Sequence, residues 1–169
     1  NKFGVNEKTF INLIKYCKNS ENIDLKCLSV HIGSQILDHK PYEKMLRVVD
    51  KIIKKTNYNF KFIDLGGGMG IQYDDKTRKL NYKKYNSAIK RFLKKHKSKI
   101  IFEPGRSIVG NTGTLISKII YIKIKEKKHF VILDAAMNDL MRPALYGSIH
   151  KLLPSTKKIK YSNKTYEFV

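Results

Sequence analysis

Cysteine, acidic side chains and long apolar runs are all scarce in this chain. Its 169 residues include 2 Cys, and 14 Asp and Glu stand against 35 Lys and Arg. Cys17 and Cys27 have no second pair that would suggest a metal site, and each falls on a predicted apolar face, so we expect small buried hydrophobes. No apolar run reaches the roughly 18 to 20 residues that cross a bilayer, and residues 1–10 lack the basic-then-apolar pattern of a secretion signal. We therefore expect a cytoplasmic chain with no membrane partner and, at 41% hydrophobic content, one ordinary core.

The basic residues are numerous but do not follow a nucleic-acid binding pattern. A formal net charge of +21 would ordinarily indicate a nucleic acid or an anionic membrane surface as the partner. Here the lysines are scattered along every segment rather than gathered in one block, and only five basic residues are arginines, namely Arg47, Arg78, Arg91, Arg106 and Arg142. We interpret most of the charge as a compositional bias on solvated faces and expect no nucleic-acid partner.

Hydrophobic spacing predicts alternating helices and strands in the first two thirds of the chain. The expected order is helix then strand, three times over, with helices at 6–19, 39–56 and 81–95 and strands at 25–33, 60–68 and 98–105. The apolar faces of the first two helices are expected to carry Phe10, Leu13, Ile14 and Cys17, and then Tyr42, Met45, Leu46, Val49, Ile52 and Ile53. The strand ends recur at about the length of one βα unit, which predicts a parallel α/β fold.

The pattern changes after Gly113. The β-rich runs 114–124 and 129–134 are joined by the charged segment "KEKK", without a helix between them, which predicts an antiparallel hairpin. A second hairpin is expected at the C-terminus, turning at Ser162-Asn163. We therefore place a domain boundary between 108 and 112, with 1–110 as the α/β part and 111–169 as a mostly antiparallel β part.

Each of the three predicted parallel strands ends in polar or glycine-rich residues. The three segments read "VHIGSQ", "DLGGGMG" and "FEPGR". The carboxyl ends of parallel strands meet at one edge of a sheet or one rim of a barrel, where ligands bind. Three such ends in succession predict one shared site.

The triple glycine, Gly66 to Gly68, has two readings. Glycines let backbone N–H groups approach an anion closely, which would suit a phosphate. The same residues can equally form a tight turn after a strand. The segment lacks the GxxxxGK[ST] pattern, which argues against a nucleoside triphosphate loop, and it lacks the helix and ribose-binding acid expected after a dinucleotide fingerprint.

Four further side chains at the strand ends fit the chemistry of a pyridine cofactor. His31 offers a flat imidazole on which a ring could lie, although a histidine at a strand end can also be purely structural. Ser34 offers a hydroxyl for a phosphate. Glu103 could keep a ring nitrogen protonated, which makes the ring a better acceptor of electrons. Arg106 offers a planar fork for a phosphate or a substrate carboxylate.

Four motifs together carry a family resemblance. "HIGSQI", "DLGGGMGIQY", "EPGRSIVGNTGTL" and "LDAAMNDLMRPALYGSIH" occur in order and resemble the diaminopimelate decarboxylase family, whose members bind pyridoxal phosphate in an alanine-racemase-like TIM barrel with a β domain. The resemblance spans 2–150. The first three motifs would suit the wider group that includes ornithine and arginine decarboxylases, whereas "MNDLMRPALYG" is more specific for diaminopimelate.

The resemblance implies a role for each matching residue. Pyridoxal 5'-phosphate would be bound by His31, Ser34, Gly66, Gly67, Gly68, Glu103, Gly105 and Arg106. His31 would stack on the ring, Glu103 would contact the ring nitrogen, and these two would be the catalytic residues of this chain. The substrate carboxylates would be held by Arg106, Arg142 and Tyr146, and the division of Arg106 between phosphate and substrate stays open. No metal is implied.

The resemblance also implies an activity for the whole protein: decarboxylation of meso-2,6-diaminopimelate to L-lysine and CO2, in a homodimer. Two family features are missing here, the "YAxKAN"-like segment with the Schiff-base lysine and the late "CESGD"-like segment that reaches the neighbouring subunit. We therefore expect an internal fragment, inactive alone: 1–110 would be the second half of the barrel and 111–169 the opening of the β domain. The alternatives are an ornithine- or arginine-type decarboxylase, a non-catalytic pyridoxal-phosphate-binding homologue, and a phosphate-binding barrel with another cofactor.

Overall fold

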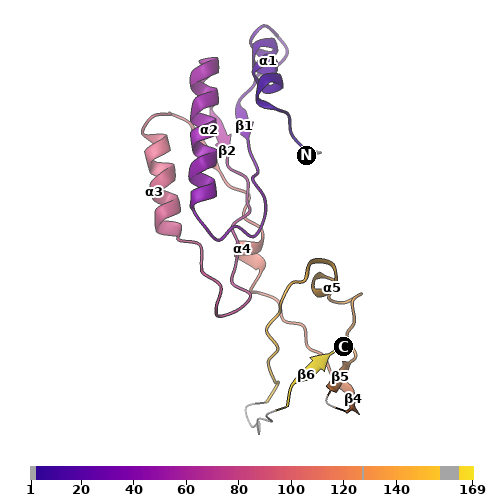
Figure 1. Cartoon of the computed structure of the whole chain (residues 1–169). Coiled ribbons are helices and arrows are strands. Elements are labelled where there is room, and N and C mark those ends of the chain that lie inside the picture. The colour runs from indigo at the N-terminus through magenta and orange to yellow at the C-terminus, as the bar shows by residue number, and fades with distance from the viewer. Residues whose placement is uncertain (1–2, 127, 157–163) are drawn as a thin grey trace. The chain divides into compact units, whose positions relative to one another are not determined.

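The computed structural model describes residues 3–126, 128–156 and 164–169. Contacts divide the chain into two compact units, the first formed by Asn1–Ile71 and Arg78–Thr112, the second by Gln72–Thr77 and Gly113–Val169. Figure 1 labels most of the elements of both. The short segment Gln72–Thr77 belongs to the second unit, whereas the sequence analysis kept it with the α/β part. The division of the whole protein into domains at about residue 110 stays a prediction.

The first unit is a three-stranded parallel sheet with helices between its strands, as predicted (Figure 1). Its elements are α1 (Glu7–Lys18), β1 (Cys27–Ser29), α2 (Lys40–Thr56), β2 (Phe62–Asp64), α3 (Tyr82–Leu93), β3 (Lys99–Ile101) and α4 (Arg106–Val109). The strand order is β1-β2-β3, with Cys27 opposite Phe62 and Phe62 opposite Lys99. The regular strands are only three residues long, but backbone hydrogen bonds continue past their carboxyl ends. The three ends therefore stay side by side.

Local sequence signals account for the ends of the helices. The side chain of Asn6 caps α1 by accepting a hydrogen bond of 2.9 Å from the Thr9 N–H, and Asn81 caps α3 in the same way. Helix α2 has a proline in its first turn and is followed by the capping residue Asn57, whose φ of 45° is left-handed. These signals fix where each helix starts and stops relative to the sheet.

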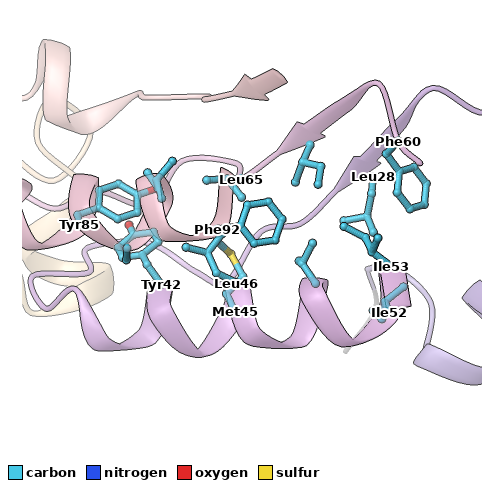
Figure 2. Packing of buried hydrophobic residues seen from close by; sticks show 14 of the residues in the cluster. Leu28, Tyr42, Met45, Leu46, Ile52, Ile53, Phe60, Leu65, Tyr85 and Phe92 are labelled. Atoms are coloured by element: carbon cyan, nitrogen blue, oxygen red, sulfur yellow. The ribbon is translucent and has the colours of Figure 1, made fainter. Parts of the chain in front are cut away.

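The core of the first unit lies between α2, α3 and the sheet. All six residues predicted for the apolar face of α2 are buried, and Figure 2 shows several of them pointing toward side chains of the strands and α3. The prediction for α1 was only partly right: Ile14 is 1% exposed, but Leu13 is 45% exposed. Cys17 and Cys27 are both half-buried free thiols rather than fully buried hydrophobes.

The second unit contains the predicted antiparallel hairpin. Its strands are β4 (Ile119–Lys125) and β5 (Lys128–Leu133), so β4 begins five residues later than expected. Strand β6 (Tyr166–Phe168) pairs with β5 in parallel, an arrangement that the sequence did not suggest. The predicted turn at Ser162-Asn163 lies outside the described residues.

No helix in the described part of the chain has the length and apolarity needed to cross a membrane.

Candidate functional site

The carboxyl ends of β1, β2 and β3 meet at the triple glycine. A Cβ added to Gly66 would lie 2.6 Å from the carbonyl oxygen of Val30 and 2.9 Å from Nδ1 of His31. A Cβ at Gly67 would collide with the carbonyl oxygen of Glu103. No side chain fits at these positions, because the neighbouring strand ends approach too closely. The structure thus brings together the three segments that the sequence analysis assigned to one site.

Backbone hydrogen bonds lock this loop into the sheet. The Glu103 N–H donates to the carbonyl oxygen of Gly66 at 2.9 Å, and the Ile36 N–H donates to that of Gly68 at 2.9 Å. Gly66 and Gly68 have φ angles of 64° and 86°, which favour glycine. The triple glycine is therefore required by strand packing and backbone conformation, whatever ligand it binds.

A buried carboxylate takes one of the N–H groups that the sequence analysis assigned to a phosphate. Oδ1 of Asp64 accepts a hydrogen bond of 2.8 Å from the Gly66 N–H, and its Oδ2 accepts one of 3.1 Å from the Ser29 hydroxyl. Asp64 is 8% exposed. Within the described residues, the N–H groups of Gly67 and Gly68 make no hydrogen bond. These two N–H groups are the ones that this conformation leaves for an anion.

The predicted side chains around the loop are open to a ligand. His31, Ser34 and Glu103 are all exposed. His31 reaches the loop at Gly66, and the backbone of Glu103 reaches it at Gly67 from the opposite side. The imidazole of His31 and the backbone of Glu103 therefore flank one glycine loop. Roles for these side chains stay predictions.

Arg106 is held by a residue that the sequence analysis did not single out. Its Nη1 donates a hydrogen bond of 2.9 Å to Oε1 of Gln35, which also accepts from the Ile71 N–H at 3.3 Å. Gly105, directly before Arg106, is exposed and has room for a Cβ. Only the position of Gln35 inside "HIGSQI" could have pointed to it.

Tyr42 supports the glycine loop from the helix beside the sheet and was predicted only as a core residue. Its ring is fully buried, and its hydroxyl donates a hydrogen bond of 3.3 Å to the carbonyl oxygen of Gly67. Burial raises the pKa of the Tyr42 hydroxyl to about 12, so it stays protonated as a donor. The ring of Tyr85 lies 4.4 Å away, centroid to centroid.

The two predicted substrate residues of the second unit lie together on one short helix. Arg142 begins α5 (Arg142–Tyr146), and its guanidinium carbon lies 5.1 Å from the centroid of the Tyr146 ring. Nε of Arg142 is buried and makes no hydrogen bond among the described residues. Tyr146 is 71% exposed. The helix ends at Gly147, whose φ of 57° is left-handed.

Comparison with known families identifies the family of the first unit. The family model described as pyridoxal-dependent decarboxylase, pyridoxal binding domain, matches residues 1–110. The chain belongs to this family. Its pyridoxal binding domain takes pyridoxal phosphate as the cofactor. The chemistry of the strand ends is compatible with that molecule, because the N–H groups of Gly67 and Gly68 have no partner among the described residues and His31 and Glu103 follow the adjoining strands.

Two curated relatives are both named diaminopimelate decarboxylase. The chain is 39% identical over 161 residues to the diaminopimelate decarboxylase of Aquifex aeolicus and 38% identical over 170 residues to that of Zymomonas mobilis. These alignments use 93% and 98% of this chain but only 38% and 39% of the relatives. The chain thus spans about two fifths of the length of the curated relatives it matches.

Solved structures agree on the fold. The diaminopimelate decarboxylase of Helicobacter pylori, complexed with L-lysine, matches with a TM-score of 0.85 at 37% identity, over 94% of this chain and 40% of that one. The lysine/ornithine decarboxylase of Vibrio vulnificus matches with a TM-score of 0.84 but 18% identity, over 99% of this chain and 46% of that one, which bears on fold alone. This pyridoxal-dependent decarboxylase chain is α/β and covers part of a TIM barrel followed by part of a mostly antiparallel β domain.

Proposed function

We propose that the whole protein removes CO2 from the D-configured end of meso-2,6-diaminopimelate and so produces L-lysine. The observation that carries the proposal is the convergence of His31, Glu103 and the triple glycine at one edge of the sheet. The identity of 39% to the Aquifex aeolicus enzyme supports this substrate over others of the family. The "MNDLMRPALYG" segment, from Met137 to Gly147, supports it as well.

Different residues of this chain would bind the phosphate and the ring of the cofactor. The N–H groups of Gly67 and Gly68 would bind its phosphate, and so would the Ser34 hydroxyl from the segment after β1. The exposed imidazole of His31 would cover one face of the ring. Bound pyridoxal phosphate supplies a protonated ring that withdraws electrons from the bond to the departing carboxylate.

Glu103 would hold a proton at the ring nitrogen. It follows β3, and its backbone is fixed by the hydrogen bond from its N–H to the Gly66 carbonyl oxygen at 2.9 Å. A carboxylate held at this position favours the charged form of a neighbouring pyridine, because opposite charges at close range stabilise each other. The fixed backbone limits how far that carboxylate can drift from the ring.

The substrate has two carboxylates, and this chain offers cations for both. Arg106 begins α4 at the strand-end site, whereas Arg142 pairs with Tyr146 on α5 in the second unit. Guanidinium groups bind carboxylates through two parallel hydrogen bonds. We propose that Arg106, Arg142 and Tyr146 each contribute to binding a substrate with a carboxylate at each end.

The proposal extends to the whole protein. The lysine that binds the cofactor covalently would be in another part of the whole protein, and so the chain alone would be inactive. The whole protein would be a homodimer in the cytoplasm. Residues 1–110 would belong to its barrel and 111–169 to its β domain.

Two other functions remain open to test. An ornithine- or arginine-type decarboxylase would share the strand-end site, and the Vibrio vulnificus structure shows how similar such a fold is at 18% identity. A homologue that binds pyridoxal phosphate without catalysis would keep the glycine loop as well. The deciding experiment supplies the full-length protein with pyridoxal phosphate and measures CO2 release from meso-diaminopimelate, L-ornithine and L-arginine separately. Release from diaminopimelate alone supports the proposal, and release from ornithine alone, or none from any substrate, refutes it.

A further inference from the structure

Gln35 has an unfavourable backbone conformation. Its φ is 60°, in the left-handed region that residues with a side chain seldom adopt. The neighbouring backbone is close as well: a Cβ on Gly70 would lie 3.0 Å from the carbonyl carbon of Gln35. Such a conformation costs free energy and persists only where other contacts compensate for it. The side chain of Gln35 makes such contacts.

Both the nitrogen and the oxygen of the Gln35 side-chain amide make hydrogen bonds. Nε2 donates to the carbonyl oxygen of Ile71 at 2.6 Å, and Oε1 accepts from the Ile71 N–H at 3.3 Å. The same Oε1 accepts from Nη1 of Arg106 at 2.9 Å. One amide thus joins three segments far apart in sequence: the chain after β1, the chain after the glycine loop, and the start of α4.

Gly110 packs against two of these residues, Ile71 and Arg106. A Cβ at Gly110 would lie 2.5 Å from Cδ1 of Ile71 and 2.6 Å from the carbonyl oxygen of Arg106. Ile71 is 9% exposed, so the Gln35 amide forms its hydrogen bonds with the backbone N–H and carbonyl oxygen of a well-packed residue. The position of the Gln35 amide is therefore set by its own backbone and by Ile71, before Arg106 is considered.

We propose that Gln35 is a positioning residue, which aims the guanidinium of Arg106 at the anion bound in this site and leaves its charge intact. An amide oxygen accepts an N–H of the guanidinium without adding a negative charge, whereas a carboxylate there would form an ion pair and compete with the ligand. A neutral amide at this position does not itself offset the positive charge that would attract a substrate carboxylate or the cofactor phosphate. This inference rests on the proposed anion-binding role of Arg106.

The test replaces the Gln35 amide by a carboxylate of nearly the same shape. Gln35→Glu in the full-length protein keeps the acceptors for Ile71 and Arg106, adds a negative charge, and loses the donor to the Ile71 carbonyl oxygen. Gln72→Glu is the matched control, because it adds the same charge one residue after Ile71, where the Gln72 side chain donates to the Thr77 carbonyl oxygen and not to Arg106. Each change is made alone and in an Arg106→Met background. Two quantities are measured: the dissociation constant of pyridoxal phosphate for the apoprotein, and the KM for substrate.

Gln35→Glu is expected to raise one of these two quantities by about tenfold or more, since it neutralises the cation that binds the anion. A raised KM assigns Arg106 to the substrate, and a raised cofactor dissociation constant assigns it to the phosphate. In the Arg106→Met background the same substitution should change either quantity by less than about twofold, because the effect acts through Arg106. Gln72→Glu should leave both unchanged.

Two outcomes overturn the inference: no change in either quantity with Arg106 present, or an equal change in both backgrounds, which would indicate a purely structural role. Gln35→Met is the second variant, for the case that the added charge prevents folding, and the same comparison between the two backgrounds applies to it. The cofactor measurement needs no turnover. A protein that decarboxylates ornithine instead of diaminopimelate would refute the proposed function yet leave this test intact.

Discussion

The hydroxyl of Tyr42 donates a hydrogen bond of 3.3 Å to the carbonyl oxygen of Gly67. Tyr42 lies in the first turn of α2 and Gly67 lies between β2 and α3, so a helix outside the sheet touches the middle of the glycine loop. Figure 2 shows the Tyr42 ring beside that of Tyr85 in the buried cluster. The two tyrosines differ in one respect, since the buried hydroxyl of Tyr85 has no partner among the described residues.

This difference predicts opposite effects for two identical substitutions in the full-length protein. Tyr42→Phe should lower the free energy of unfolding by about 1 kcal/mol, because it leaves the Gly67 carbonyl oxygen without its donor. It should also weaken binding of pyridoxal phosphate, because the loop is less firmly held. Tyr85→Phe removes an unsatisfied hydroxyl and should be neutral or slightly stabilising. Denaturant unfolding and cofactor titration check both, and equal losses in the two variants would contradict this account.

Gly67→Ala should be severely destabilising. Its Cβ would overlap the carbonyl oxygen of Glu103, a backbone atom that cannot move without breaking the sheet. We expect a loss of about 3 kcal/mol or more, together with loss of cofactor binding. Gly113→Ala is the control, since nothing lies within 4 Å of its added Cβ. Thermal unfolding of both variants measures the contrast, and a Gly67→Ala protein as stable as the control would rule out the close approach of the strand ends.

The periodic parts of the fold were predictable from sequence because their signals are local. The six apolar positions of α2 repeat at helical spacing, and all six are buried. The glycine loop was predicted as a shared site for a similar reason, since three strand ends in a parallel sheet must meet. By contrast, Leu13 has the right spacing on α1 but is 45% exposed, because spacing does not say how much of a helix face is covered.

Long-range side-chain contacts were beyond reach of the sequence. Gln35 and Arg106 are 71 positions apart, and nothing local marks their hydrogen bond. Asp64 takes the Gly66 N–H, which had been assigned to a phosphate, and this contact depends on how the loop turns back over the strand. The parallel pairing of β6 with β5 has no local signal either, because a strand's composition does not reveal its neighbour's direction.

An ion-pair cluster between α2 and the segment after α3 predicts a pH-dependent contribution to stability. Asp50 accepts a hydrogen bond of 2.8 Å from Lys54, and its other oxygen lies 2.7 Å from Nε2 of His96. The hydrogen bond from Lys54, followed by that from His96, lowers the pKa of Asp50 below its usual value. A carboxyl with a lowered pKa stabilises the fold above its unfolded pKa of about 3.9, and this contribution is lost as the pH falls through the folded value.

Asp50→Asn should therefore reduce the free energy of unfolding at pH 6 by about 1 kcal/mol or less, and the difference from the wild-type protein should shrink as the pH falls below about 3.9 and through the lowered pKa of Asp50. Asp24→Asn is the control, because Asp24 pairs with Lys26 at an exposed position and should matter little at any pH. Urea unfolding at several pH values gives the comparison. A difference that persists unchanged at low pH would show that the charge of Asp50 is not responsible.

Arg142→Ala in the full-length protein should mainly raise the KM for substrate. Its guanidinium packs over the Tyr146 ring and, in our proposal, binds one substrate carboxylate. Removal of a contact that is the same in the ground state and the transition state raises KM and leaves kcat nearly unchanged. Steady-state kinetics and cofactor titration separate the two cases. An unaltered KM would show that Arg142 does not bind the substrate. Weakened cofactor binding would indicate that it acts on the cofactor instead.

The central claim is that Glu103 holds the proton of a pyridine ring bound where three strand ends meet. The most direct measurement compares Glu103→Gln with wild-type full-length protein for pyridoxal phosphate affinity and for kcat with diaminopimelate. We predict a cofactor dissociation constant within about threefold of wild type and a kcat lower by about a hundredfold or more, since the amide keeps the shape of the carboxylate but not its charge. An unchanged kcat with bound cofactor would contradict the account.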